Sequence, residues 1–181
     1  LAVTIYFPQA FTRIADLGRT SRYEVRTVED FSINSMVTRI LIWMTAWQAF
    51  LAHPLVGIGA YSFPFASAEY FTIPPSLYLR YVQGLSPHVT YLASLVETGI
   101  VGLTGFLVFL GSSLRTASRA VGLSRVGEER YVSTSIFVVQ LYIAVSMTMT
   151  DAWLWSQCGM LWALILGMNA GNYRALVRAH E

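Results

Sequence analysis

Three long apolar segments constrain the fold of this chain of 181 residues more than any other feature. They cover about residues 91–114, 132–150 and 152–171. A helix that crosses the hydrocarbon core of a bilayer needs roughly 20 predominantly apolar residues. We therefore expect an all-α membrane protein, with three transmembrane helices in the region 91–171.

The composition agrees with this class of protein. Only 12% of the residues are charged and 55% are hydrophobic, whereas soluble domains usually carry about a quarter charged residues. All 12 basic residues are arginine, and the formal net charge is +2. Because this charge is small and the arginines form no dense run, we expect no nucleic-acid partner.

The distribution of arginines predicts the orientation of the helices. Four follow the first apolar segment and two lie in the tail 172–181: Arg115, Arg119, Arg125, Arg130, Arg174 and Arg178. The positive-inside rule puts that loop and the C-terminal tail in the cytoplasm. The turn at Asp151 and the region 1–90 then face outward. The opening "LAVTIYF" is too short to span, so we interpret it as the tail of a truncated membrane helix and expect a fragment of a larger multi-span bundle.

The outward region 1–90 contains one short apolar stretch, "RILIWMTAWQAFLAHP". It is too short to span a bilayer, so we expect an interfacial helix over about residues 39–52. Helical spacing places Arg39, Trp43, Trp47 and Phe50 on one side, and tryptophan favours the headgroup level. Pro54 and the glycines that follow it are expected to end the helix.

His88 is the first candidate for chemistry. Pro87 suits the first turn of a helix, so we expect Ser86 to be the N-cap of the first span. His88 would then lie at the outer membrane boundary beside a helix N-terminus. The helix dipole there favours a neutral imidazole, the form that a general base needs. The alternative is an interfacial histidine that only caps or packs.

Glu97 lies deeper in the first span. On a continuous helix it would point roughly opposite His88, so the two are not expected to form an acid–base pair. A glutamate at that depth is costly and is either functional or a structural partner for an arginine or a backbone group of a neighbouring helix. Gly99 and Gly102, with Gly105, form a stripe where we expect another helix to approach closely.

Arg39 and Arg80 are the candidates for anion binding. A guanidinium presents a planar fork of donors that matches phosphate oxygens. The alternative is that each arginine binds lipid phosphate non-specifically at the membrane surface. Four other arginines are expected to be solvated or paired with nearby acidic residues: Arg13, Arg19, Arg22 and Arg26.

Several chemistries have no support in the sequence. No metal-ligand spacing is present, and a lone cysteine, Cys158, excludes a thiolate zinc site and suits an apolar packing role. No phosphate-binding glycine loop with lysine and no nucleophile elbow is found. We expect neither a metal nor another cofactor.

Two blocks of the sequence together resemble the O-antigen ligase and O-antigen polymerase superfamily. "SPHVTYLASLVETGIVG" resembles its signature of a histidine followed by "YL", "E-x-G" and a second glycine: His88, Tyr91, Leu92, Glu97, Gly99 and Gly102. "RILIWMTAWQAFLAHPLVGIGAYSF" resembles its Arg-x-x-x-Trp helix leading into a "P-L-x-G-x-G" turn: Arg39, Trp43, Pro54, Gly57 and Gly59. The resemblance covers about Met36 to Gly102.

The resemblance implies a multi-pass glycosyltransferase of the bacterial inner membrane, with the region 1–90 on the periplasmic side. Its donor would be a glycan on undecaprenyl pyrophosphate, and its acceptor a glycan or lipid A–core, used without metal. It also implies that Arg39 helps hold the donor pyrophosphate, with Arg80 as a second such arginine by position. His88 would activate or orient the acceptor hydroxyl.

One position departs from the ligase pattern. Ligases usually carry Asn, Ser or Gln after the histidine, whereas this chain has Val89, which favours a polymerase-like or other member. Two further interpretations remain open. A transporter from the same superfamily would use Glu97 in an ion path, and a scaffold subunit of an envelope complex would use none of these residues chemically.

Overall fold

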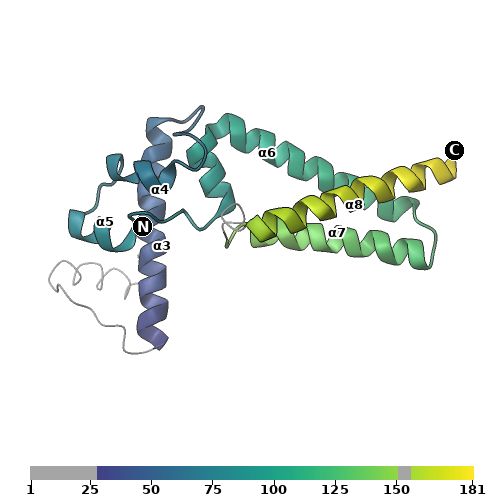
Figure 1. Ribbon diagram of the computed structural model, residues 1–181, viewed down its shortest axis with the longest axis horizontal. Helices are drawn as coiled ribbons and strands as arrows, with labels where there is room; N and C mark the ends of the chain where they lie inside the picture. The colour runs from purple at the N-terminus through teal and green to yellow at the C-terminus, as the bar shows by residue number, and fades with distance from the viewer. Residues whose placement is uncertain (1–27, 151–155) are drawn as a thin grey trace. The chain divides into compact units, whose positions relative to one another are not determined.

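The computed structural model describes residues 28–150 and 156–181, with side chains over 35–150 and 159–181. Within these ranges every regular element is a helix, which agrees with the predicted all-α class. The helices fall into two compact units (Figure 1). The first comprises residues up to Pro87 together with Leu95–Ile100, and the second comprises His88–Ser94 and Val101–Glu181.

The longest helix of the first unit is α3, Val28–Ala52. It begins well before the predicted start near residue 39, and it ends where Pro54 was expected to stop it. Its buried positions recur at helical spacing and are all apolar or small: Val37, Leu41, Ile42, Thr45, Ala46 and Ala49. Trp43 and Trp47 lie on its exposed side with Arg39. The predicted common side is therefore confirmed for Arg39, Trp43 and Trp47, whereas Phe50 is half-buried.

Three short helices follow α3 in the first unit: α4 (Phe63–Ala66), η1 (Ser67–Glu69) and α5 (Pro75–Tyr81). Pro75 occupies the first position of α5, where a missing N–H costs nothing. The hydroxyls of Ser67 and Tyr78 are 3.0 Å apart, and the ring of Phe71 stacks on Tyr78. The region 1–90 thus contains short helices that the sequence did not predict.

The helix α6 spans Thr90–Leu123 and contains one residue with non-helical backbone, Gly99. Among the described residues it is the one helix long and apolar enough, by length and composition, to cross a membrane. The predicted loop after residue 114 was wrong for its first residues. The helix continues to Leu123, so Arg115 and Arg119 lie on it rather than in a loop.

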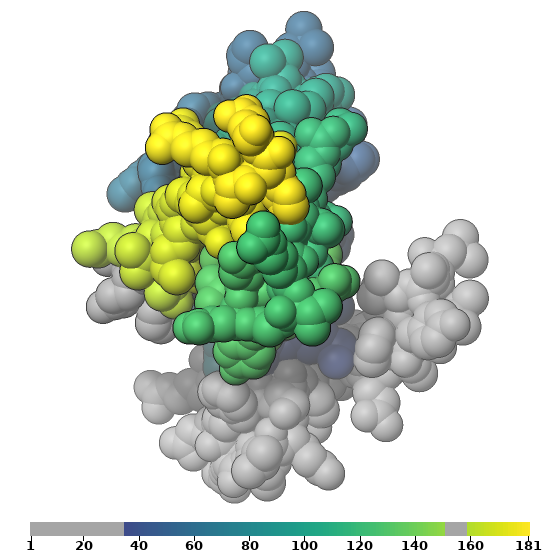
Figure 2. Space-filling view, turned by 90° about the vertical axis from the view of Figure 1, so that its right-hand side faces the viewer, coloured from purple at the N-terminus to yellow at the C-terminus, as the bar shows by residue number. Residues whose placement is uncertain are grey.

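The second unit contains most of α6 with α7 (Glu128–Ser146) and α8 (Ser156–His180). Both later helices cover the greater part of the predicted segments 132–150 and 152–171. The predicted tail 172–181 is helical up to His180, whose imidazole Nε2 lies 2.9 Å from the Leu123 carbonyl oxygen. Figure 2 shows this end of the unit, with the C-terminal residues in yellow beside the green residues of α6 and α7.

The core of the second unit combines apolar and polar contacts. Leu110, Ala144, Met147 and Trp162 are buried together. Buried polar side chains also join the helices: Ser113 Oγ donates to Gln140 Oε1 at 2.6 Å, and Asn169 Nδ2 donates to the Ser113 carbonyl at 3.0 Å. Such bonds between helices favour one register over others.

Some predictions fall outside the described residues. These are the N-terminal segment, the Asp151 turn, the side chain of Cys158 and the four arginines at positions 13, 19, 22 and 26.

Candidate functional site

The break in α6 at Gly99 is closed by backbone from the loop after α3. Gly99 has φ 68° and ψ −169°, which no residue in a helix adopts. The Ile100 N–H donates to the Pro54 carbonyl at 2.9 Å. The carbonyls just before the break accept from the same loop, Val96 from Ile58 at 3.1 Å and Glu97 from Gly59 at 2.9 Å. The loop therefore satisfies polar groups that the break exposes.

Two glycines permit this close contact. A Cβ on Gly99 would overlap the carbonyl of Leu55, and a Cβ on Gly57 would overlap the carbonyl of Glu97. Both glycines also have positive φ, 68° and 70° respectively, which side chains rarely adopt. The expectation that a helix would approach Gly99 was wrong, because its neighbour is loop backbone. A Cβ on Gly105 would meet nothing within 4 Å.

The carboxylate of Glu97 holds the next part of this loop. Its Oε2 accepts from the Tyr61 N–H at 2.9 Å, and its Oε1 lies 3.4 Å from the Phe63 nitrogen. These contacts support a structural role for Glu97. Its partner in them is the backbone of residues 61–63, rather than the arginine or the backbone of a neighbouring helix that the sequence suggested. Glu97 acts here as an anchor for residues 61–63.

His88 does not lie on the helix. The N-cap of α6 is Val89, with extended backbone, and the predicted N-cap Ser86 was wrong. The first N–H of the helix, on Thr90, instead donates to the carbonyls of Met147 and Thr150 at the end of α7. Because His88 precedes the helix, its angle to Glu97 around a helix axis has no meaning. His88 itself is half-buried and has a left-handed φ of 54°.

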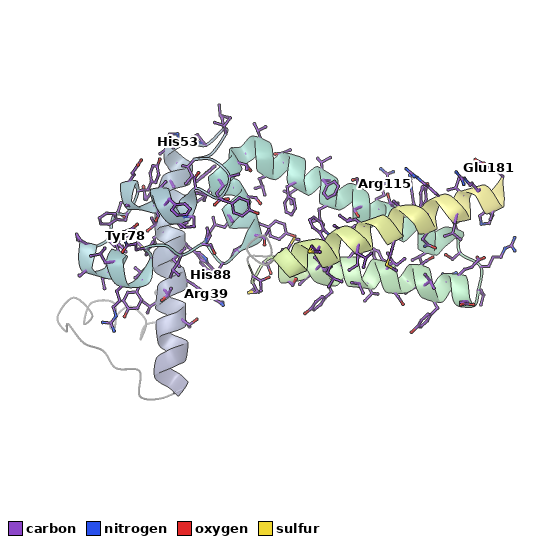
Figure 3. All side chains as sticks on the ribbon, in the orientation of Figure 1. Arg39, His53, Tyr78, His88, Arg115 and Glu181 are labelled. Carbon is purple, nitrogen blue, oxygen red and sulfur yellow. The ribbon has the colours of Figure 1, made fainter. Side chains whose placement is uncertain are left out.

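The segment before His88 is held by α3. The Trp43 indole Nε1 donates to the Pro87 carbonyl at 3.0 Å. Arg39 is one helical turn earlier on α3 and is exposed. Figure 3 labels Arg39 on this helix. Trp43, whose role the sequence left uncertain, therefore connects the helix that carries Arg39 with Pro87.

Arg80 lies in the last turn of α5 and is exposed, with its guanidinium 5.4 Å from the centre of the Tyr81 ring. Gly102 is half-buried on α6. Within the described ranges, no group of three or more His, Cys, Asp or Glu side chains is arranged to hold a metal ion.

Sequence reasoning missed the contribution of Pro54, Tyr61 and Phe63, which act through backbone groups. One signal was present. Each family-like block contains glycines, and one from each block, Gly57 and Gly99, proved to be a point of contact between the blocks. Glycine is the residue expected where one backbone must approach another closely.

Together these features define an all-helical protein with a discontinuous helix of membrane-crossing length, whose break is closed by a loop from an earlier part of the chain. Comparison with known proteins identifies the family. A family model described as O-antigen ligase matches residues 1–107, more than half of the chain. The protein therefore belongs to the O-antigen ligase family, and the resemblance seen in the two blocks is confirmed. Searches of curated proteins and of solved structures gave no match.

Proposed function

We propose that the protein transfers or polymerises a glycan carried on undecaprenyl pyrophosphate, at the periplasmic face of the bacterial inner membrane. Family membership supports a ligase-like enzyme of surface polysaccharide biosynthesis. The acceptor would be a growing glycan or a lipid A–core. The observation that carries the proposal is the bond from Trp43 to Pro87. It ties the helix bearing Arg39 to the residue that precedes His88.

Arg39 is proposed to bind the donor pyrophosphate. Its guanidinium is exposed and can present two parallel N–H donors to phosphate oxygens. It stays protonated at any working pH, so it can offset the charge that develops on the pyrophosphate as it leaves. Arg80 is proposed as a second contact to the same group.

His88 is proposed to act on the acceptor. The acceptor hydroxyl oxygen attacks the anomeric carbon of the donor sugar, and the bond from that carbon to the pyrophosphate oxygen breaks. The imidazole takes the proton of the hydroxyl as the new glycosidic bond forms. His88 is half-buried rather than buried, which is compatible with access by such a substrate.

Two details refine the proposal. Val89 is apolar and cannot hydrogen-bond a sugar, which favours a polymerase-like or other member over a typical ligase. Glu97 accepts bonds from the loop at Tyr61 and Phe63. An ion path through Glu97, as a transporter would need, therefore has no specific support from these contacts.

The test is a His88→Ala substitution in the protein expressed from its own gene, with surface polysaccharide followed by gel. We expect glycan attachment or chain length to be lost at normal expression. His53→Ala is the matched control, because His53 is an exposed histidine bonded to Tyr70 in the same outward region. Normal polysaccharide in the His88→Ala strain would overturn the proposal. A scaffold role predicts that outcome together with loss of polysaccharide on deletion of the gene.

A further inference from the structure

Two non-glycine residues in the described part of the chain have left-handed backbone, Tyr61 with φ 57° and His88 with φ 54°. This conformation is unfavourable for residues with a Cβ and persists only when the surroundings impose it. Strained residues of this kind concentrate at functional sites. Each of the two therefore requires a contact that holds it.

In both cases a side chain fixes the peptide group that precedes the strained residue. Glu97 accepts from the N–H of Tyr61, and Trp43 donates to the carbonyl of Pro87, the residue before His88. Proline has no N–H, so its carbonyl is the one hydrogen-bonding group that Pro87 offers. Pro87 is also buried, which restricts the peptide further.

We propose that Trp43 is a positioning residue for His88. Its indole N–H holds the peptide group between Pro87 and His88 and so sets the direction in which the imidazole leaves the backbone. The inference rests on the proposed function, because it gives Trp43 a role only if His88 acts on the acceptor. It goes beyond family membership, since it assigns a task to an atom, Trp43 Nε1.

A core-packing role accounts less well for this tryptophan. Trp43 is 41% exposed, so it is not a core residue. Trp47, one turn further along α3, is 49% exposed. For Trp47 the described residues show an aromatic contact with Phe50, with ring centres 5.2 Å apart, rather than an indole hydrogen bond. Trp47 is therefore a matched control for exposure, residue type and helix.

The experiment compares Trp43→Phe with Trp47→Phe in the whole protein, purified in detergent and supplied with an undecaprenyl-pyrophosphate-linked oligosaccharide and its acceptor. We expect Trp43→Phe to lower kcat by about 10- to 100-fold, the scale of a small misplacement of a reacting group. The KM for the donor should change by less than about twofold, because binding of the donor is assigned to Arg39. Trp47→Phe should leave both constants unchanged.

A second comparison separates positioning from general damage. If Trp43 acts through His88, the double variant Trp43→Phe/His88→Ala should be no slower than His88→Ala alone. Where Trp43→Phe does not fold, benzothienylalanine at position 43 keeps the ring shape and removes only the N–H. It should give the same loss of kcat.

The outcomes are distinct. Equal activity of Trp43→Phe and Trp47→Phe, with the kcat of His88→Ala strongly lowered, overturns the positioning role and leaves the proposed function standing. A raised donor KM with unchanged kcat in Trp43→Phe also overturns it, because Trp43 would then belong to donor binding. Full activity of His88→Ala overturns the proposed function itself.

Discussion

Glu97 accepts a hydrogen bond from the backbone N–H of Tyr61, with 2.9 Å between Oε2 and the nitrogen. The other carboxylate oxygen faces the N–H of Phe63. Just beside these contacts, the backbone of residues 54–59 closes the break at Gly99. The "P-L-x-G-x-G" and "E-x-G" blocks of the sequence are therefore two halves of one structural joint.

Glu97→Gln should weaken this joint. Glutamine keeps the length of the side chain, but it offers one acceptor oxygen, and its NH2 group would face an N–H donor. Bonds to a charged group contribute about 1.5–3 kcal/mol, so we expect the free energy of unfolding to fall by roughly this amount or somewhat less. Thermal unfolding in detergent measures the change. Glu69→Gln, at an exposed glutamate in η1, is the control and should have no effect. Equal stability of the two variants would show that the Glu97 contacts do not hold the loop.

Gly99→Ala should disrupt the same joint from the other side. The new Cβ would overlap the Leu55 carbonyl, and the alanine would also have to adopt the positive φ of Gly99. Gly99 has ψ −169° as well as positive φ, a backbone region that is essentially restricted to glycine. The backbone strain alone costs about 1–3 kcal/mol, and the overlap adds to it. Gly105→Ala is the control on the same helix, since its Cβ meets nothing within 4 Å. There alanine should be neutral or stabilising by up to about 1 kcal/mol. The joint as described is wrong if both variants melt at the same temperature.

The sequence predicted the parts of the fold that hydropathy and proline encode. All three apolar segments are mainly helical where the structure describes them, although the second ends in a turn after Ser146, and α3 ends before Pro54. The break in α6 was not predicted, because Gly99 lies within a segment whose hydropathy predicts one continuous helix, and its effect depends on backbone bonds to a distant loop. A glycine at a positive φ and a glycine at a helix contact look the same in a sequence.

The same limit explains the wrong N-cap. Ser86 and Pro87 have the composition of a helix start, but the first N–H of α6 is satisfied by carbonyls of Met147 and Thr150. These partners come from the end of α7, far along the chain. Local sequence therefore could not locate the first residue of the helix, and the left-handed backbone of His88 was missed with it.

Binding of the lipid-linked donor should depend on the shape of the Arg39 side chain as well as on its charge. If its guanidinium binds a pyrophosphate through two parallel bonds, Arg39→Ala should raise the KM for the lipid-linked donor by about 10- to 100-fold, the equivalent of a lost charged hydrogen bond. Arg39→Lys keeps the charge but loses the fork, so it should restore only part of the affinity. Steady-state kinetics in detergent measures both, and Arg119→Ala, at an exposed arginine on α6, is the control. A wild-type KM in Arg39→Lys would contradict a contact through two parallel hydrogen bonds and would indicate that only the charge matters.

Ser113 should stabilise the second unit more than its neighbour Ser112 does. The Ser113 hydroxyl donates to Gln140 Oε1 at 2.6 Å, and Gln140 is fully buried. The Nε2 of Gln140 already has no hydrogen-bond partner in the described structure, so Ser113→Ala would leave both ends of this amide unpaired. Polar bonds between helices in membrane proteins contribute about 0.6 kcal/mol on average and at most about 1.7, and we expect a loss in this range.

The Ser112 hydroxyl is exposed and bonds only to the Phe109 carbonyl one turn back on the same helix, so Ser112→Ala should be neutral. SDS-induced unfolding measures both variants, and equal shifts would mean that the bond from Ser113 to Gln140 contributes nothing to the packing of α6 against α7.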